Sequence, residues 1–487
     1  MQPIRFYLND RLIEDREVAP TTTLLDYLRQ HAHLAGTKEG CAEGDCGACS
    51  VAILDAEAPG GPRFRAINAC LVLLPMVQGQ RVYTVEGLKT GAALHPVQEA
   101  LAEAIGSQCG YCTPGVVMSM FEACYRGDLA EPWQLDDQMC GNLCRCTGYR
   151  PIREATAKVA GSLPADRFRA RLEGATAGAR GFAQVREGQV FVTPSSLEEL
   201  WAAMAAHPEA RLLCGGTDLA LTLTKRFEAL PLLISLEGIA ALRGVSGDGA
   251  RGWRIGATTL LADLEAASAA ELVPLHRMLR YFASRQIKNR ATVGGNLCNA
   301  SPIGDLAPVL LALGATVEVA STAGVREVGL DAFFVGYRRT ALAKGEILAA
   351  VRVPPLAKGA LASAYKVSKR RELDISAVAA GFYVELDDEG RVAVIRAGFG
   401  GMAATPSRAR HLEAALLGRP WSEASMEAAV GELGRDFAPI GDHRGSSWYR
   451  QTVAANLVRG FFFETRGDPR PRLPQRPSST VALEVLP

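Results

Sequence analysis

Four cysteines near the N-terminus have the spacing of an iron–sulfur ligand set. Cys41, Cys46 and Cys49 follow the pattern C-x4-C-x2-C, and Cys70 comes after a further twenty residues. This is the plant-type ligand arrangement of a [2Fe–2S] cluster. The loop also contains three glycines, which allow positive φ values and a close approach of backbone N–H groups to sulfur: Gly40, Gly44 and Gly47. A zinc site and a group of core thiols are the alternatives, but zinc favours two separate C-x2-4-C pairs.

A second group of cysteines lies beside predicted helix starts. Cys109 and Cys112 form a C-x2-C pair before Thr113-Pro114, and Cys144 and Cys146 form a C-x-C pair before a helix that begins near residue 152. Helix N-termini favour negative charge and suit an anionic thiolate cluster. We expect these four thiolates to hold a second [2Fe–2S] cluster, with structural zinc as the alternative.

The remaining cysteines are not expected to bind metal. Cys124 lies in the middle of a predicted helix and is interpreted as a small buried residue. Cys140 lies four residues before Cys144 and could compete with it as a ligand. Cys214 and Cys298 are assigned to packing.

The composition indicates an ordinary soluble multidomain protein. Its 487 residues exceed what one hydrophobic core supports, so three to four domains are expected. The net charge of +1 gives no indication of nucleic-acid binding, and no uninterrupted run of eighteen apolar residues predicts a membrane span. Twelve cysteines, eight of them with metal-ligand spacing, and no export signal favour the reducing cytoplasm.

The expected elements place both cysteine groups in small domains. A hairpin over residues 4–19, a helix capped at Thr22 or Thr23, the cysteine loop, and strands near 50–54, 64–69 and 81–86 are the order of a ferredoxin-like β-grasp domain. Four helices are then expected around the second cysteine group. Residues 161–185, rich in Gly, Ala and Arg, show no clean period and are predicted to be a linker.

Two glycine-rich loops occur in the mixed α/β region that follows. An apolar strand runs into Leu213-Cys214-Gly215-Gly216-Thr217-Asp218-Leu219, and a second loop runs from Thr292 to Asp305. Such loops present bare backbone N–H groups to phosphate oxygens. Because neither loop is G-x-G-x-x-G, a dinucleotide would bind outside the Rossmann scheme. Antiparallel strands at 382–386 and 392–397, and helices near 409–417 and 449–463, complete the expected fold.

With these motifs the chain resembles the small, iron–sulfur and flavin subunit of the bacterial xanthine dehydrogenases, members of the molybdenum hydroxylase family. The resemblance covers roughly residues 1–465, in the right domain order. The matching segments are Lys38–Ser50, Gln108–Gly115, Gly141–Ile152, Gly215–Leu219 and Arg285–Asn296 with its continuation to Asp305.

The resemblance implies an α+β multidomain fold with defined boundaries. These are a plant-type [2Fe–2S] ferredoxin-like domain (1–87), a helical [2Fe–2S] domain (88–160), the linker (161–185), an α/β FAD-binding domain (186–358), a C-terminal flavoprotein domain (359–465) and an extended tail (466–487). It also implies that the FAD pyrophosphate lies over 213–219, and that FAD contacts a second set of residues: Val293, Gly294, Gly295, Asn296, Ser301 and Asp305. The segment Val335–Arg339 resembles the family's stretch near the nicotinamide pocket. Cys214 and Cys298 stand at positions that vary in the family, which is the basis for assigning them to packing.

The function implied is electron transfer without a catalytic residue on this chain. Electrons from hypoxanthine or xanthine hydroxylation, at a molybdopterin centre on a separate large chain, would pass through both clusters to FAD and then to NAD⁺. A heterotetramer of two small and two large chains is expected, with no nucleic acid and no membrane. The alternatives are the same subunit of an aldehyde, CO or hydroxybenzoyl-CoA enzyme, and a non-enzymatic cluster protein acting as a redox sensor or carrier.

Overall fold

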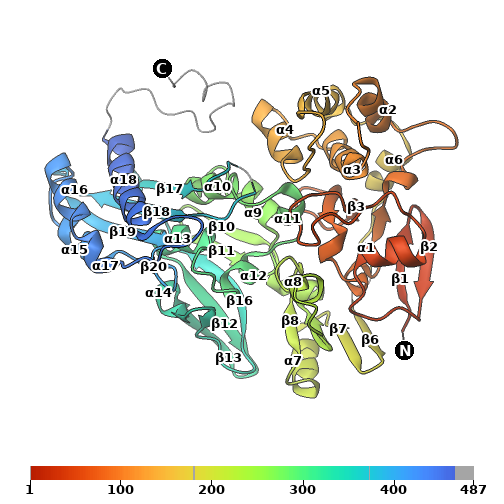
Figure 1. The fold of residues 1–487 in the computed structure, drawn as a ribbon. Helices are drawn as coiled ribbons and strands as arrows, with labels where there is room; N and C mark the ends of the chain where they lie inside the picture. The colour runs from red at the N-terminus through yellow and green to blue at the C-terminus, as the bar shows by residue number, and fades with distance from the viewer. Residues whose placement is uncertain (1, 179–180, 372, 467–487) are drawn as a thin grey trace.

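The computed structural model describes residues 2–178, 181–371 and 373–466. Figure 1 shows the N-terminal units on one side, the C-terminal unit on the other, and the glycine-loop region between them. The tail expected at 466–487 lies outside the described residues, apart from Arg466. Within the described part of the chain, no helix combines the length and apolarity needed to cross a membrane.

The first unit is the expected β-grasp sheet. Its strands have the order β2-β1-β5-β3-β4, in which β1 and β5 are parallel and the other pairs are antiparallel. The strands are β1 (Ile4–Leu8), β2 (Arg11–Asp15), β3 (Ser50–Asp55), β4 (Arg63–Asn68) and β5 (Arg81–Tyr83). Helix α1 (Leu24–Asp26) is capped by the Thr23 side chain and continues into a π-helical turn, Tyr27–His31.

The second unit contains the four expected helices and a further one. They are α2 (Pro96–Glu103), α3 (Thr113–Cys124), α4 (Pro132–Met139), α5 (Arg150–Val159) and α6 (Arg167–Glu173). Helix α6 lies within the predicted linker, and its Phe168 is 1% exposed against Phe64, Tyr83 and Phe121. Seven helical residues are too few to show a clear amphipathic period, which is why the sequence pattern did not indicate this helix.

The third unit contains two sheets. The first has the order β6-β7-β9-β8, formed by β6 (Phe182–Arg186), β7 (Gln189–Thr193), β9 (Leu232–Ser235) and β8 (Arg211–Leu213). The second is antiparallel with the order β10-β11-β16-β12-β13, formed by β10 (Val245–Asp248), β11 (Gly252–Gly256), β16 (Ile347–Val353), β12 (Thr316–Ser321) and β13 (Gly324–Gly329). A hairpin of β14 (Phe334–Gly336) and β15 (Arg339–Thr340) follows.

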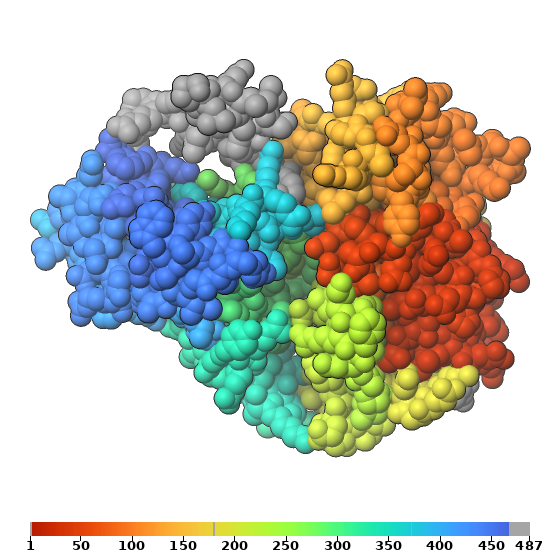
Figure 2. Space-filling view, viewed as in Figure 1, coloured from red at the N-terminus to blue at the C-terminus, as the bar shows by residue number. Residues whose placement is uncertain are grey.

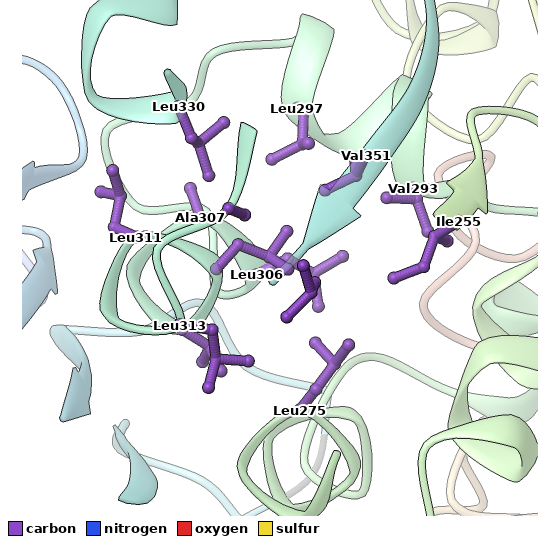
Figure 3. Close-up of a cluster of buried hydrophobic side chains, with 14 of the residues drawn as sticks. Ile255, Leu275, Val293, Leu297, Leu306, Ala307, Leu311, Leu313, Leu330 and Val351 are labelled. Atoms are coloured by element: carbon purple, nitrogen blue, oxygen red, sulfur yellow. The ribbon is translucent and has the colours of Figure 1, made fainter. Parts of the chain in front are cut away.

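Short helices connect these sheets and position the second glycine loop. They are α7 (Leu197–Ala206), α8 (Ala220–Thr224), α9 (Leu261–Ala267), α10 (Val273–Leu279), α11 (Arg285–Lys288), α12 (Val293–Cys298), α13 (Leu306–Ala312) and α14 (Leu330–Phe333). Val293 and Leu297 of α12 point into a core with Ile255, Leu306 and Val351 (Figure 3). This packing anchors one face of α12 and leaves Gly295 and Cys298 exposed on the other.

The C-terminal unit is an antiparallel sheet covered by helices. Its strands are β17 (Leu361–Val367), β18 (Val378–Leu386), β19 (Val392–Gly400) and β20 (Ser407–Arg408), in that order. Its helices are α15 (Arg410–Leu416), α16 (Glu423–Val430), α17 (Leu433–Asp436) and α18 (Ser447–Thr465). The α+β multidomain fold expected from the sequence is therefore confirmed.

The units share hydrophobic cores across the predicted boundaries. Core residues of the β-grasp sheet pack together with Phe191, Leu213 and Leu233 of the third unit. On its other side, the sheet contributes Phe64 and Tyr83 to the core of the helical unit. Figure 2 accordingly shows a continuous surface from the red first unit to the orange second unit. The domain boundaries remain predictions, and the first three units pack as one block.

Candidate functional site

The first four cysteines lie in two pairs. The Sγ atoms of Cys49 and Cys70 are 3.4 Å apart, and each residue is 2% exposed. The thiols of Cys41 and Cys46 contact each other nearer the surface. The Cys41 sulfur also accepts N–H groups at 3.3–3.4 Å from Glu43, Asp45 and Cys46. The Cys46 thiol and these N–H donors together lower the pKa of Cys41 to about 5, which favours the thiolate that metals bind.

The three glycines of this loop make room for sulfur and backbone. A Cβ atom on Gly40 would lie 2.6 Å from the Cys46 sulfur, so a side chain there would displace the thiol. Gly44 and Gly47 have φ values of +85° and +68°, which L side chains rarely adopt. A Cβ atom on Gly47 would also stand 2.1 Å from the backbone oxygen of Gly141. The loop therefore fits a cradle for a bulky inorganic group.

The second group of cysteines is also paired, but lies closer to solvent. Cys109 contacts Cys146, and both are exposed. Cys112 caps α3 and contacts Cys144, which is 7% exposed. Burial and the nearby Cys144 raise the pKa of Cys112 to about 12. Among the described residues, no three side chains of Cys, His, Asp or Glu converge to hold a single ion; the thiols are arranged two by two.

The four cysteines assigned to other roles lie apart from these pairs. Cys124 is fully buried, and its thiol lies 3.3 Å from the Ser162 hydroxyl. Cys140 ends α4, Cys214 lies in the first glycine loop, and Cys298 ends α12 on an exposed face. Burial raises the pKa of the Cys214 thiol to about 12, which disfavours a thiolate at neutral pH.

The backbones of the two cysteine loops touch each other. The N–H of Leu143, the residue before Cys144, donates to the carbonyl of Cys46 at 2.9 Å. The side chain of Asn142 donates to the carbonyl of Gly47 at 3.2 Å. The backbone beside Cys144 of the second group is therefore hydrogen-bonded directly to Cys46 of the first group.

The first glycine loop connects β8 to α8 and packs against the first cysteine group. Gly215 and Gly216 have φ values of +72° and +78°. A Cβ atom on Gly215 would lie 2.0 Å from the Arg290 carbonyl, and one on Gly216 would lie 2.7 Å from the carbonyl of Leu71. Leu71 follows the fourth cysteine of the first group, so this loop touches the cluster site directly. Of the other loop residues, Leu213 is buried and Asp218 is exposed.

The second glycine loop lies beside the first. The Thr292 side chain accepts the N–H of Gly295 at 3.1 Å and begins α12. A Cβ atom on Gly294 would lie 2.7 Å from that of Ala257, so glycine permits the helix to pack closely on its neighbour. A Cβ atom on Gly295 would lie 3.9 Å from the Cys214 carbonyl, which places the two loops side by side. The two glycine loops therefore lie next to each other, as a shared pyrophosphate site would require.

Asp305 closes the second loop against the C-terminal unit. Its carboxylate, 6% exposed, accepts Lys366 Nζ at 2.8 Å and the Ser376 hydroxyl at 2.5 Å. Ser301 begins a turn in which its carbonyl accepts the N–H of Gly304, and the Asn296 side chain of α12 lies near that glycine. Neither Lys366 nor Ser376 belongs to a recognisable motif, so the sequence pattern gives no indication of this contact.

Two cavities lie beside the loops, away from their glycines. One of about 320 Å³ is lined by Arg65, Arg290 and Cys214 among others, and one of about 770 Å³ is lined partly by Arg243 and Asp263. The described residues that line them do not include the four loop glycines. The placement of FAD over the loops therefore stays a prediction from the sequence.

The segment Val335–Arg339 forms the tip of the β14–β15 hairpin. Val335 and Tyr337 are 55% and 63% exposed. The resemblance of this segment to the stretch near the nicotinamide pocket stays a prediction.

Glu122 joins three units at one carboxylate. It belongs to α3 and is 1% exposed. It accepts the backbone N–H of Ala66 from β4 at 3.0 Å and the side chain of Gln138 from α4 at 3.0 Å. Arg285 at 3.2 Å and Asn289 at 3.1 Å approach from the third unit. Burial opposes the charge, but Arg285 and the other donors outweigh it and lower the pKa of Glu122.

Three further buried ion pairs stabilise the same junction. Lys288 of α11 is fully buried and bonds to Asp137 of α4 at 3.1 Å and to Glu265 of α9 at 2.9 Å. These carboxylates outweigh the burial penalty and raise the pKa of Lys288. Arg65 of β4 bonds to Asp263 of α9 at 2.7 Å. The sequence motif that contains α11 gives no indication of this structural role.

Comparison with protein families gives the class of protein that this fold and site define. Four families match in chain order: a 2Fe-2S iron-sulfur cluster binding domain at 6–74, a [2Fe-2S] binding domain at 84–157, the FAD binding domain in molybdopterin dehydrogenase at 183–356, and the CO dehydrogenase flavoprotein C-terminal domain at 363–465. The protein is an iron–sulfur flavoprotein.

Curated relatives then identify the family. The chain is 32% identical to the xanthine dehydrogenase of Emericella nidulans, covering 98% of this chain and 40% of the relative. It is 32% and 34% identical to the xanthine dehydrogenase/oxidases of Rattus norvegicus and Mus musculus, over 94% of this chain and 38% of each relative. The chain thus spans about 40% of the length of the relatives that it matches. It belongs to the molybdenum hydroxylase family as an iron–sulfur and FAD module, homologous to the corresponding region of the xanthine dehydrogenases.

Solved structures agree with this assignment. CO dehydrogenase from Oligotropha carboxidovorans matches with a TM-score of 0.52 and 27% identity, covering 55% of this chain and 94% of that chain. Quinoline 2-oxidoreductase from Pseudomonas putida 86 matches with a TM-score of 0.52 and 25% identity, covering 56% and 95%.

Proposed function

We propose that this chain is the electron-transfer subunit of a cytoplasmic xanthine dehydrogenase. In this proposal a separate molybdopterin-binding chain hydroxylates hypoxanthine or xanthine, and this chain carries the electrons to NAD⁺. When bound, [2Fe–2S] clusters pass single electrons and FAD exchanges two, which is the chemistry that the cofactors supply. The residues of this chain hold and space those groups, and none acts as an acid or base on the purine.

The observation that carries the proposal is the order of the sites. The second cysteine group lies at the surface, and its loop touches the first group through the Leu143–Cys46 hydrogen bond. In the first group, Cys49 and Cys70 are buried, and Leu71, which follows Cys70, touches the first glycine loop at Gly216. A path thus runs inward from the surface, through both thiol groups, to the loops assigned to FAD.

The surface around the second group supports a partner chain. Four large apolar side chains are 42–75% exposed on the loops and turns near Cys109 and Cys146: Ile105, Tyr111, Leu143 and Tyr149. A cluster ligand surrounded by exposed apolar residues fits a protein interface better than a free surface. The curated relatives extend well beyond the part that this chain matches.

We favour xanthine over CO as the substrate that supplies the electrons. The xanthine dehydrogenases match 93–98% of this chain, whereas the CO dehydrogenase structures match 55% of it. The corresponding subunit of a CO dehydrogenase remains the second candidate, because the solved CO dehydrogenase structures match the flavoprotein fold of this chain.

The test uses the purified full chain, first alone and then with its large partner. We expect about four iron atoms and four acid-labile sulfides per chain, as two [2Fe–2S] clusters require. NADH should reduce the flavin, and xanthine should do nothing until the large chain is added. Stoichiometric zinc without sulfide would overturn the cluster assignment. Activity with CO but not xanthine would favour the second candidate.

The partner surface has its own test. Ile105→Asp places a charge among the exposed apolar side chains and should weaken binding of the large chain at least tenfold. Its NADH-to-dye activity should match that of the unmodified chain, because Ile105 lies away from the glycine loops. Unchanged binding of the large chain would remove this surface from the proposal.

A further inference from the structure

Helix α11 of the third unit enters the place where the two cysteine loops meet. Figure 1 shows it at the boundary between the green third unit and the red and orange units. Its Gln286 is 1% exposed and lies between elements of both cluster-binding units. The Gln286 side chain donates to the Asn142 side chain at 2.9 Å and to the Ser119 hydroxyl at 2.9 Å.

Asn142 extends this contact to both cysteine loops. Its oxygen accepts from Gln286, and its side-chain nitrogen donates to the carbonyl of Gly47 in the first loop. The next residue, Leu143, donates its N–H to Cys46. A single side chain of the flavin-binding unit therefore holds the residue that joins the two cluster loops.

The glycines show how little free space the junction has. A Cβ atom on Gly141 would lie 2.0 Å from Gln286 Oε1 and 2.6 Å from the Cβ atom of Ser284. No positive φ is found at Gly141, so the space taken by α11, rather than a turn, requires glycine there. The Gly141 carbonyl in turn lies where a Cβ atom on Gly47 would stand. The Gly47 carbonyl lies 2.0 Å from the place that a Cβ atom on Gly115 would take. We call this series of contacts, from Gln286 through Gly141 and Gly47 to Gly115, the glycine stack.

We propose that Gln286 is a positioning residue for electron transfer between the two clusters. It acts through Asn142 and the glycine stack, and sets the spacing of two cluster sites to which it contributes no ligand. The flavin-binding unit thus controls the cluster-to-cluster step as well as the flavin step. This inference deepens the proposed function, since the spacing matters only if electrons pass between the clusters.

The variant Gln286→Met tests the proposal in the full chain. Met has a similar volume but donates no hydrogen bond, so Asn142 and Ser119 lose their partner without a cavity. Gln184→Met is the matched control, because Gln184 is also fully buried and donates one hydrogen bond, to Val18 at 3.1 Å, far along the chain from the glycine stack.

Two measurements separate positioning from general stability. Hydrogen exchange should become about tenfold faster for peptides that cover 141–147 in Gln286→Met and stay unchanged there in Gln184→Met, as loss of a buried hydrogen bond predicts. In the dithionite-reduced chain, the magnetic splitting between the two cluster EPR signals should change in Gln286→Met alone. Iron and FAD contents should equal those of the unmodified chain.

A second variant tests the stack from the other side. Gly141→Ala should push Gln286 aside and change the same splitting, because its Cβ atom would collide with Gln286 Oε1. An unchanged splitting and unchanged exchange in Gln286→Met would overturn the proposal, as would equal changes in Gln184→Met.

These outcomes can be told apart from a failure of the proposed substrates. Dithionite replaces NADH and xanthine, so a chain that fails with those substrates still reports on Gln286. A chain that holds no clusters would overturn both proposals, whereas a chain that holds both clusters but fails with NADH or xanthine would overturn the proposed function alone.

Discussion

Replacing Glu122 by Gln is expected to loosen three units at once. The two oxygens of Glu122 accept from Ala66 and Gln138 on one side and from Arg285 and Asn289 on the other. The NH₂ group of Gln would therefore face donors in either orientation. At least two buried donors would lose their acceptor, and each such loss costs about 1–3 kcal/mol. Breaking a buried ion pair costs about 3–5 kcal/mol, so a loss of about 3–4 kcal/mol in stability is expected.

The pH dependence gives an independent check on this reasoning. The folded-state pKa of Glu122 lies below its usual value of 4.5, so the unfolded chain binds the proton more readily. The stabilisation by the carboxylate is thus fully present above pH 4.5 and is lost as the pH falls through the folded pKa. The difference between Glu122→Gln and the unmodified chain should shrink over this acidic range.

Calorimetry and hydrogen exchange measure the effect. Amide hydrogen exchange should become faster in peptides from β4, α3 and α11. The thermal unfolding transition of the block formed by the first three units should move to lower temperature. Glu413→Gln is the control, since Glu413 is a buried carboxylate paired with Arg408 at 2.8 Å in the C-terminal unit. Its exchange should rise only in that unit. If Glu122→Gln unfolds at the same temperature as the unmodified chain and its amide hydrogens exchange no faster, Glu122 does not join the units.

Three further predictions follow from the site. Cys70→Ser should remove the plant-type EPR signal and about half of the iron while leaving the other signal, because the four thiols of each group are separate; loss of both signals would contradict this. Gly216→Asp should lower FAD content at least tenfold and perturb the first cluster, since its side chain would meet Leu71 as well as the pyrophosphate, whereas retained FAD would place the flavin elsewhere. Burial outweighs the nearby Asp166 and lowers the pKa of His95 below 6.5, so the unmodified chain should lose stability as the pH falls below 6.5. His95→Asn keeps a helix cap and should flatten that dependence in thermal melts from pH 7.5 to 5.5.

The cysteine groups could be anticipated because their information is local. Ligand spacing, glycines and helix starts all lie within short segments such as 40–49 and 109–115. The confirmed α+β fold follows from similar local patterns. The residues missed act over long range: Glu122 meets Arg285, 163 positions away. From the sequence alone, a helical carboxylate that is buried and joins several units cannot be distinguished from one on a solvent-exposed face.

The glycines show the same limit. The sequence explained Gly47 by loop curvature, and its positive φ agrees. The structure adds a contact with Gly141, which no spacing rule predicts, because it depends on how two units meet. Ligand assignments and domain boundaries still rest on the sequence reasoning, and the measurements above test them.

The glycine stack also has a consequence for biogenesis. Cys49 and Cys70 lie beneath a junction that α11 and Gly216 close, and Gln286 meets Ser50 across 236 positions of chain. Both cluster-binding units leave the ribosome well before α11 does, since synthesis proceeds from the N-terminus. Iron and sulfide therefore have a period in which the thiols are open, and it ends when the third unit docks. Maturation of this protein is thus expected to be sequential, with cluster insertion first and flavin last.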